Sequence, residues 1–532
     1  MNDGKIYVAC RETSTRYPKS LRTWGSRSIF LCLLFFFNIL YFNCYCQINK
    51  SGNTVIFGVE CSVGIFSGDT SRPTTERKWP IIQGTDRVFT SGHSCISDSA
   101  SGTIKIICNG YRLFDTLGNI MDNGDSLVPP KIFTHNSIPD APTTQGSIIL
   151  PKGSNGLYYV FVATTTDSAY DYWIANGTEA PYNILQYHVV DINANNGLGK
   201  VIEKNKKIVQ FSRLNKVGMM ACRHANGYDW WLLKQAGYDS NMIYRFLVKA
   251  DTIEGPYLQV FNSIKFGKYD NLGQSCFSTN GKQYAYVTGG KNKIFLADFD
   301  RCSGLLSNPK LIPVPIDSTT YPFIDNQGVR DSLMTGICFS SNDSFIYLSK
   351  EYNIYQLDLM DTNSSTKWYR IQHGSDTSAL WFEYYGQLYR EPDGRIYIGK
   401  YGSNSNSCSV IDYPNKKGVA CGFCRKCFRV DSSYSIVSPA NMPDFNLGAD
   451  SSSCWPLSNV QLAISNEQLK VYPNPAKSVL YMQTTSKQKR VLYNYTGQLL
   501  FTTTENKIDV SKYPRGLYFV KCGAEAIKVI LE

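Results

Sequence analysis

A short stretch in the middle of this 532-residue chain holds the side chains best suited to chemistry. In RHANGYD, His224 is followed by Asn226 and Asp229, which supply an imidazole, an amide and a carboxylate around one turn. Such groups can bind a metal ion or a small ligand when they converge. A histidine beside a hairpin turn is more commonly a structural hydrogen-bonding group, so this stretch is a weak candidate ligand site. The other histidines are His93, His135, His188 and His373.

Motifs for familiar reactions are missing from the sequence. It contains no G-x-S-x-G, H-E-x-x-H or P-loop pattern, and serine-containing runs such as GSDTS are typical of loops. A metal-dependent hydrolase would need carboxylate, Asn or His ligands converging from several parts of the fold. We therefore assign no catalytic residue, no metal-ligand set and no cofactor. The sequence favours a binding or structural protein, with a hydrolase as the alternative.

Cysteines form the second cluster of reactive side chains. Thirteen of the 17 cysteines follow residue 46, and the densest group is CGFCRKC, with two further cysteines nearby. Zinc sites usually present two well-placed pairs of ligands, which this spacing does not offer. Disulfides are the preferred interpretation, with a metal site or free thiols as alternatives, and the connectivity cannot be read from sequence. The candidates are Cys408, Cys421, Cys424, Cys427 and Cys454.

The elements that must position these residues repeat along the chain. The segments beginning at Ala221, Ser275 and Ile337 each place a turn residue five positions after a cysteine, and an aromatic-rich strand follows. Asn-Gly or Asp-Gly between alternating apolar runs indicates a β-hairpin. Similar units predict turns near residues 102, 156, 227, 281, 343 and 394. We expect the repeated cysteines to be small buried core residues.

Repeats of short strands at this period indicate the blades of a β-propeller. Six units are visible, and a seventh could combine Thr54–Phe66 with strands near 428–447, which would close the ring and cover its sheet edges. We therefore expect an all-β protein with a propeller of seven blades, or alternatively six. The segments from CISDSASGTIKIICNGYRLFD through HANGYDWW resemble a propeller family of surface and secreted bacterial proteins, related to WD40-like and lactonase-like propellers. That resemblance implies a fold and an extracytoplasmic setting.

Net charge argues against a nucleic-acid partner. The total of +11 divides into +4 from residues 1–27, +6 from residues 470–532 and about +1 from everything between. A nucleic-acid binder usually concentrates Lys and Arg on its main domain. The middle region of this chain has no such surplus, so no nucleic-acid partner is expected.

The N-terminus has the pattern of a secretory signal. A basic lead precedes the apolar run Ile29–Phe42, which is too short for the roughly 20 residues that cross a bilayer but suits the h-region of a signal peptide. Cys44 and Cys46 supply small residues before a cleavage that would leave Gln47 as the new N-terminus. An uncleaved anchor and a lipoprotein site are the alternatives. Export is the expected outcome.

The last 60-odd residues predict a separate small β-sandwich with an Ig-like character. Prolines in VYPNPA mark the entry to a new sheet, and alternating strands follow with turns at NYTG and YPRG. This order resembles the type A sorting domain of type IX secretion. The matching residues are Tyr472, Pro473, Asn474, Pro475, Gly497, Asp509, Ser511, Gly516 and Tyr518.

The resemblance implies partners and a destination. It implies recognition by an outer-membrane translocon and a sortase-like peptidase, and delivery through the periplasm to the surface of a Gram-negative bacterium or its medium. A glycan or protein ligand on the propeller face is the expected further partner. The predicted domains are a signal peptide at 1–46, a propeller at 47–447, a Ser-rich linker at 448–468 and the sorting domain at 469–532.

Overall fold

The computed structural model describes most of the chain after residue 48. The described residues run from 49 to 532 except for 58–61, 67–72, 78–88, 90–91, 136–142, 177–181, 238–240, 263, 265–272, 289–291, 316–322, 325–329, 332–333, 351, 364–366, 373–383, 402–406, 430–437, 451–453, 455–468, 484–488, 495–497 and 523–524. The expected signal segment, with Cys46 and Gln47, lies outside them, as do His373 and Gly497. No helix among the described residues is long and apolar enough to span a membrane.

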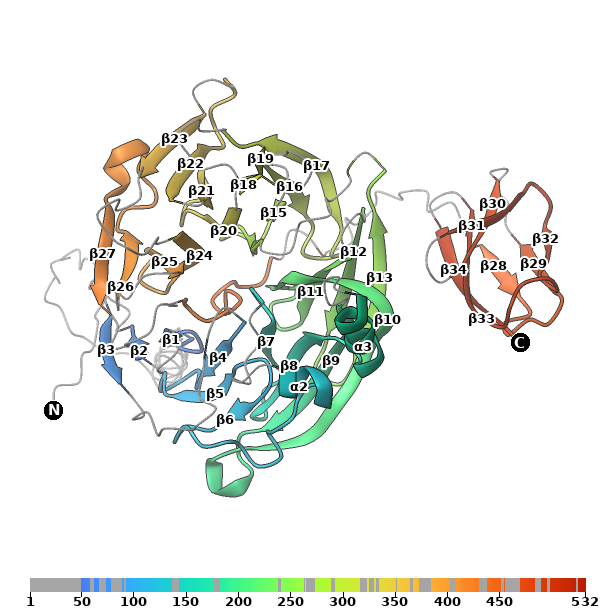
Figure 1. Ribbon diagram of the computed structural model, residues 1–532, viewed down its shortest axis with the longest axis horizontal. Coiled ribbons are helices and arrows are strands. Elements are labelled where there is room, and N and C mark those ends of the chain that lie inside the picture. The colour runs from blue at the N-terminus through green and yellow to red at the C-terminus, as the bar shows by residue number, and fades with distance from the viewer. Residues whose placement is uncertain are drawn as a thin grey trace, which may run out of the picture. The chain divides into compact units, whose positions relative to one another are not determined.

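Seven antiparallel blades form a ring (Figure 1). Each blade is numbered here in chain order, with its inner strand first. Blades 1 to 3 contain β1(Thr54–Phe57), β2(Ser62–Ile65) and β3(Thr74–Arg77); β4(Ser94–Ser97), β5(Ile104–Cys108) and β6(Leu113–Phe114); and β7(Ser147–Pro151), β8(Leu157–Thr164), β9(Tyr182–Asp191) and the first part of β10(Lys200–Arg223).

The remaining blades follow the same plan. Blade 4 contains the end of β10 with β11(Trp230–Ala236), β12(Met242–Val248) and β13(Ile253–Val260), and blade 5 contains β14(Ser275–Phe277), β15(Gln283–Thr288), β16(Lys293–Phe299) and β17(Leu306–Pro313). Blades 6 and 7 contain β20(Met334–Phe339), β21(Phe345–Lys350), β22(Asn353–Asp358) and β23(Trp368–Gln372); and β24(Tyr384–Arg390), β25(Ile396–Tyr401), β26(Ser407–Ile411) and β27(Phe423–Arg429).

The long strand β10 joins two blades into one seven-stranded sheet. Residues from Lys200 pair with β9 as the outer strand of blade 3, and residues up to Arg223 pair with β11 as the inner strand of blade 4. Leu214 has a partner on each side, Tyr182 and Ala236, and marks the change of blade. The smaller elements are α2(Pro130–His135), α3(Asp167–Asn176), η1(Asn195–Gly197), the hairpin β18(Phe323–Ile324) with β19(Arg330–Asp331), and η2(Gly418–Cys421).

The ring closes through both strand pairing and side-chain packing. Phe57 of β1 forms an antiparallel bridge with Pro439, so the chain beyond blade 7 returns to blade 1. Buried clusters fill each junction: Phe57 packs with Tyr397 and Phe428 of blade 7, and separate clusters join blades 4 and 5, 5 and 6, and 6 and 7. The largest cluster joins blades 2, 3 and 4. The seven-bladed prediction is confirmed. The predicted closure is realised only in part, because β1 to β3 form a blade of their own, β27 belongs to blade 7, and among the described residues Pro439 alone bridges to β1.

Turn chemistry explains the repeat. Every predicted turn contains a residue with positive φ, between +58° and +86°, at positions 102, 156, 227, 281, 343 and 394. Five of them are glycine, which adopts this conformation without steric cost, and the sixth is Asp343. Each turn connects the inner strand of a blade to the next strand. The repeated Cys222, Cys276 and Cys338 are buried thiols, as expected.

The C-terminal region is a sandwich of two antiparallel sheets. One contains β28(Lys470–Tyr472), β29(Val479–Gln483) and β32(Lys507–Asp509). The other contains β31(Leu499–Thr503), β30(Arg490–Asn494), β33(Gly516–Cys522) and β34(Glu525–Leu531). A core of its own, including Leu480, Leu492 and Val520, lies between them. The predicted sandwich is confirmed.

Candidate functional site

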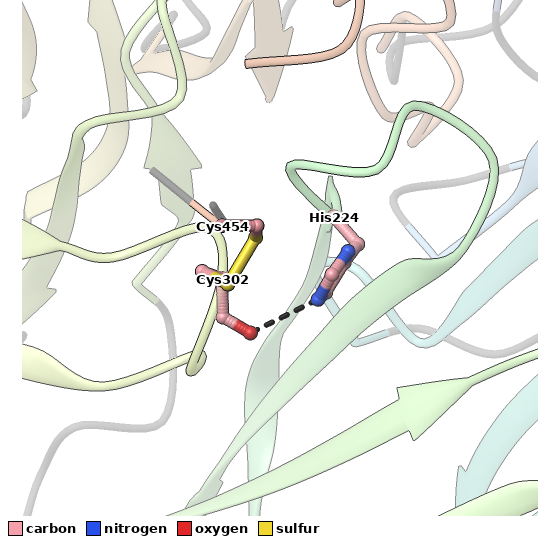
Figure 2. Close-up of side chains that lie close together, drawn as sticks. All are labelled: His224, Cys302 and Cys454. Atoms are coloured by element: carbon pink, nitrogen blue, oxygen red, sulfur yellow. Dashed lines mark hydrogen bonds between the residues drawn. A yellow bond between two sulfur atoms is a disulfide. The ribbon is translucent and has the colours of Figure 1, made fainter. Parts of the chain in front are cut away.

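The His224 turn is held by hydrogen bonds on both ring nitrogens, and Figure 2 shows the one to Cys302. Nε2 donates to the carbonyl oxygen of Cys302 at 2.9 Å, and Nδ1 accepts from the backbone N–H of Asn226 at 3.0 Å. The amide of Asn226 in turn donates to Asp229 at 2.8 Å. The three predicted residues therefore do lie together, and each is occupied in shaping the turn. The neutral Nε2–H tautomer satisfies both contacts.

Two sulfur atoms lie beside this histidine, but they are bonded to each other. Cys302, in the turn between β16 and β17, forms a disulfide with Cys454 (Figure 2). His224, Cys302 and Cys454 are the one group of three potential metal ligands among the described residues. A disulfide sulfur is not the thiolate that binds zinc or copper. In this state the cluster is a covalent tie between the end of the propeller chain and blade 5.

The five cysteines of the predicted cluster fall into three groups in the structure. Cys424 and Cys427 form a disulfide within β27, so the cluster contains a disulfide as expected. Cys454 pairs with Cys302, outside the cluster, because the chain returns across the ring before reaching it. Cys408 and Cys421 are buried and lie outside both of these disulfides, and their pairing stays a prediction. Residues up to Cys454 therefore remain attached to the propeller, although the predicted linker began at 448.

The middle of the ring is filled by the chain itself. We call residues 438–447 the plug (Figure 1). Its Asn441 donates from Nδ2 to the carbonyl oxygens of Ser147 and Met219, at 2.9 and 3.2 Å, and its backbone N–H donates to His93 at 2.9 Å. These carbonyls belong to blades 2, 3 and 4. Asn441 thus links blades 2, 3 and 4, although the plug belongs to none of these blades.

Three buried glutamines brace the ring from blade to blade. Gln145 of blade 3 donates to the Ser275 carbonyl of blade 5 at 2.9 Å and to Asn441 Oδ1 at 3.1 Å. Gln274 spans from blade 5 to Leu388 of blade 7 at 2.7 Å. Gln387 of blade 7 reaches Thr144 Oγ1 at 2.6 Å and accepts from the plug residue Ser438. Amides and hydroxyls satisfy one another here, which is required of buried polar groups. Sequence reasoning missed these residues because the partners named here are 51 to 296 positions away.

A cavity of about 290 Å³ lies where the plug meets the ends of four inner strands. We call it the plug pocket. Most of its lining is apolar, with phenylalanine, leucine and proline side chains alongside a group of sulfur atoms. The repeated cysteines of the sequence line it, so the repeat also marks the site. The sulfur-bearing residues are Met220, Cys222, Cys276, Cys338 and Met442.

Glu391 is the acidic group of this pocket. It follows β24 and is 4 % exposed, and no residue that the structure describes forms a hydrogen bond with its carboxyl group. Burial, reinforced by the negative charge of Asp393, raises its pKa to about 8, although Arg390 opposes the change. Asp393 is itself paired with Arg395 at 3.1 Å and accepts from Tyr397 at 2.8 Å. Glu391 is therefore a largely protonated acid at neutral pH.

Arginines give the pocket a positive surplus. Arg390 pairs with Asp444 of the plug at 3.1 Å. The guanidinium of Arg223 lies 4.2 Å from the Trp230 ring centre and donates to the carbonyl oxygens of Gly227 and Phe445. Its Nε has no hydrogen-bond partner among the described residues. Behind it, Arg301 donates to carbonyl oxygens including that of Arg223. Burial lowers the pKa of Arg223; the charge of Asp444 opposes this change, and the charge of Arg301 adds to it.

In the C-terminal sandwich, the predicted sorting residues mostly shape turns and edges. Asn474 donates to the Lys528 carbonyl at 2.8 Å and accepts from Ile530 N–H at 2.9 Å, which fixes β34. Asp509 accepts from the N–H and hydroxyl of Ser511, and these bonds lower its pKa. Tyr518 is buried and donates to the Pro514 carbonyl at 2.6 Å.

Tyr472 differs from these residues because it is exposed. Its ring stacks on that of Tyr481, with ring centres 6.1 Å apart, and both side chains are about half exposed. Nothing in the sequence marked Tyr481. The pair forms an aromatic surface on the sheet that contains the VYPNPA segment.

Comparison with known proteins identifies the end of the chain. Residues 470–531 match the family described as the secretion system C-terminal sorting domain. The chain is therefore sorted to the cell surface or the extracellular space, as in Bacteroidetes-type bacteria. No protein with a curated description matches the chain by sequence.

Solved structures with a similar fold include lactonase-like propellers. A putative 6-phosphogluconolactonase from Bacteroides uniformis is 13 % identical, with a TM-score of 0.34 over 86 % of this chain and 97 % of that one. The periplasmic gluconolactonase of Pseudomonas aeruginosa is 11 % identical, with a TM-score of 0.35 over 90 % and 99 %. A hydrazine synthase from Kuenenia stuttgartiensis is 12 % identical, with a TM-score of 0.32 over 68 % and 90 %. Likenesses this distant carry no argument about function.

Proposed function

We propose that this exported propeller is a binding or structural scaffold at the cell surface, handled by the type IX translocon and a sortase-like peptidase. A rigid ring that presents many loops suits a glycan or protein ligand. The alternative is a lactonase-like hydrolase with a metal ion in the central channel, which would need several carboxylate or His ligands directed at the axis.

One observation carries the proposal: the axis is occupied by the plug. Asn441 and the three cross-ring glutamines use their amides to hold blades together, and their partners are carbonyls, hydroxyls and each other. Such a network stabilises a single ring geometry. It also takes up the place where a channel metal would have to be held. These residues support a scaffold whose surface, rather than its channel, is functional.

The test separates binding from turnover. The purified exported chain would be incubated with aliphatic lactones and glucono-δ-lactone, with and without Ca²⁺, Mg²⁺ and Zn²⁺, while acid release is titrated. In parallel, the immobilised chain would be exposed to purified surface lipopolysaccharide and to glycan arrays. We expect saturable retention of a glycan or protein and no turnover above that of heat-denatured chain. Metal-dependent hydrolysis that EDTA removes and metal restores would overturn the scaffold proposal.

A further inference from the structure

The plug pocket combines features that the scaffold role leaves unused. It is a cavity of about 290 Å³, at the small end of the range for ligand sites, so it suits a small molecule rather than a polymer. The carboxyl group of Glu391, a residue that is 4 % exposed, lines it, and no described side chain donates a hydrogen bond to this group. Its carboxyl oxygens are not among the enclosed polar atoms left without a partner, so the group is available to a ligand in the cavity.

The charges around the pocket select the sign of a ligand. Arg223, Arg301 and Arg390 contribute three positive charges, and Asp444 is the carboxylate paired with them among the described residues. Glu391 adds no charge while it is protonated. A buried cationic surplus favours an anion, and a guanidinium is well suited to a carboxylate.

We propose that the plug pocket binds a small organic acid with an apolar body, whose carboxylate accepts a hydrogen bond from the protonated Glu391 and faces the surplus charge of Arg223. The apolar part of the ligand would lie against Phe277, Phe445 and the sulfur atoms of the pocket. This inference goes beyond the proposed function, which assigns a glycan or protein ligand to the outer surface, and adds a small-molecule site beside the plug. No covalent step is involved, and one proton is held between the two carboxyl groups.

Binding must then depend on pH, because Glu391 donates only when protonated. Its pKa of about 8 places the change above neutrality. Burial raises the pKa values of the neighbouring thiols, to about 12 for Cys95 and about 11 for Cys338, so they stay neutral across this range. The groups that interact electrostatically with Glu391 are Arg390, Asp393, Cys95, Cys338 and Tyr397. Arg223 and Asp444 line the same pocket.

Calorimetric titration of the full exported chain tests the proposal with four probes: benzoate, benzamide, benzylamine and inorganic phosphate. We expect saturable binding of benzoate at pH 7, at least tenfold weaker binding of benzamide and benzylamine, and no preference for phosphate. Benzoate stays ionised above pH 6, because ordinary carboxyl groups titrate near pH 4. Its affinity should fall at least tenfold between pH 7 and pH 9.5.

The matched variants are Glu391→Gln and Glu254→Gln. A glutamine amide donates without titrating, so Glu391→Gln should keep benzoate affinity at pH 7 within about threefold and remove its pH dependence. Glu254 is a carboxyl group on blade 4, paired with Lys249, and its variant should behave as wild type. An unchanged pH dependence in Glu391→Gln would overturn the inference, as would the absence of benzoate binding. Preferential binding of benzylamine would show that the proposed ligand class is wrong and would leave the scaffold proposal intact. Turnover of a lactone would contradict the scaffold proposal and would leave the proposed ligand class intact.

Discussion

The propeller and the C-terminal sandwich use their polar side chains over very different distances along the chain. In the sandwich, Asp509 bonds Ser511 two positions away and Tyr518 bonds Pro514 four positions away. In the propeller, Gln145 bonds Ser275 across 130 positions and Asn441 bonds Ser147 across 294. Asn474 of the sandwich also bonds Lys528 across 54 positions, but the turn residues Asp509, Ser511 and Tyr518 form local bonds that a sequence pattern can record, whereas the cross-blade bonds of the propeller leave no such pattern.

That difference explains why the role of the sorting domain can be read from its sequence, whereas the role of the propeller cannot. The sorting domain must be recognised in the same way whatever precedes it, so its turns carry the signature. The propeller's role depends on which side chains meet at the axis and beneath the plug, and only the closed ring brings these together. Changes to the sandwich should therefore affect delivery, whereas changes to the propeller should affect stability.

The largest effect should come from removing the sorting domain. A chain ending after Gln468 keeps the seven blades, the plug and the Cys302–Cys454 disulfide, because all of them lie upstream. Its propeller should melt within a few degrees of the full chain, since the sandwich has a core of its own. Surface delivery should be lost, and the chain should accumulate in the periplasm.

Cell fractionation and calorimetry check this prediction. Residues 469–532 fused to an unrelated passenger with a signal peptide provide the reciprocal control and should carry it to the surface of a host with type IX machinery. A truncated chain that still reached the surface would show that delivery does not depend on this domain.

A second change, Asn441→Ala, tests whether the plug holds the ring. It removes two donated bonds and the acceptor for Gln145, and leaves buried carbonyls of Ser147 and Met219 unpaired. We expect the free energy of unfolding of the propeller to fall by about 2–4 kcal/mol, since each unsatisfied buried group costs about 1–3 kcal/mol. The exposed plug residue Asn446 supplies the control, and Asn446→Ala should change stability by less than about 0.5 kcal/mol. If urea unfolding gave equally small effects for Asn441→Ala and Asn446→Ala, the hydrogen bonds of the plug would contribute little to the stability of the ring.

Lys234 gives the propeller a pH dependence that the sandwich core should lack. Its side chain is fully buried, donates to the Val217 carbonyl at 2.7 Å, and has a pKa lowered by burial to about 7. Between pH 10.5 and pH 7 the unfolded chain takes up a proton that the folded chain does not. Stability therefore falls as pH is lowered through this window and is constant below it.

The effect of Lys234→Met on the stability of the propeller should change sign with pH. Below pH 7 it removes the cost of burying a charge and should stabilise the propeller by about 1–3 kcal/mol, even after the Val217 carbonyl loses its donor. Above pH 10.5 only that loss remains, and the variant should be less stable than wild type. Lys207→Met, at an exposed position, is the control. Urea unfolding at pH 6 and pH 10.5 checks both signs, and a pH-independent difference would contradict the buried-amine account.

The same contrast between local and distant bonds explains how much of the fold and of the candidate site could be predicted from the sequence. Six turns could be placed because each needs a residue that tolerates positive φ, and ring closure followed from the unpaired ends. His224 and Asn226 were found because they surround such a turn. Glu391, Gln387 and Asn441 carry no local signal: their environment is created by blades and a plug that are distant in the chain. The partner of Cys454 was missed for the same reason.

The smallest expected effect concerns His224, the most conspicuous chemical group in the sequence. His224→Ala should lower stability by about 1 kcal/mol, because it removes one bond to Cys302 and one acceptor for Asn226 in a partly buried turn. Asn226→Ala, which removes the acceptor for the N–H groups of Tyr228 and Asp229, should have an effect of similar size. Under non-reducing conditions Zn²⁺ should leave the melting temperature of both variants and of wild type unchanged, since the nearby sulfur atoms are in a disulfide. A zinc-dependent rise in wild type that is lost in His224→Ala but kept in Asn226→Ala would instead make this turn a metal site, and the propeller would then carry a local chemical signal after all.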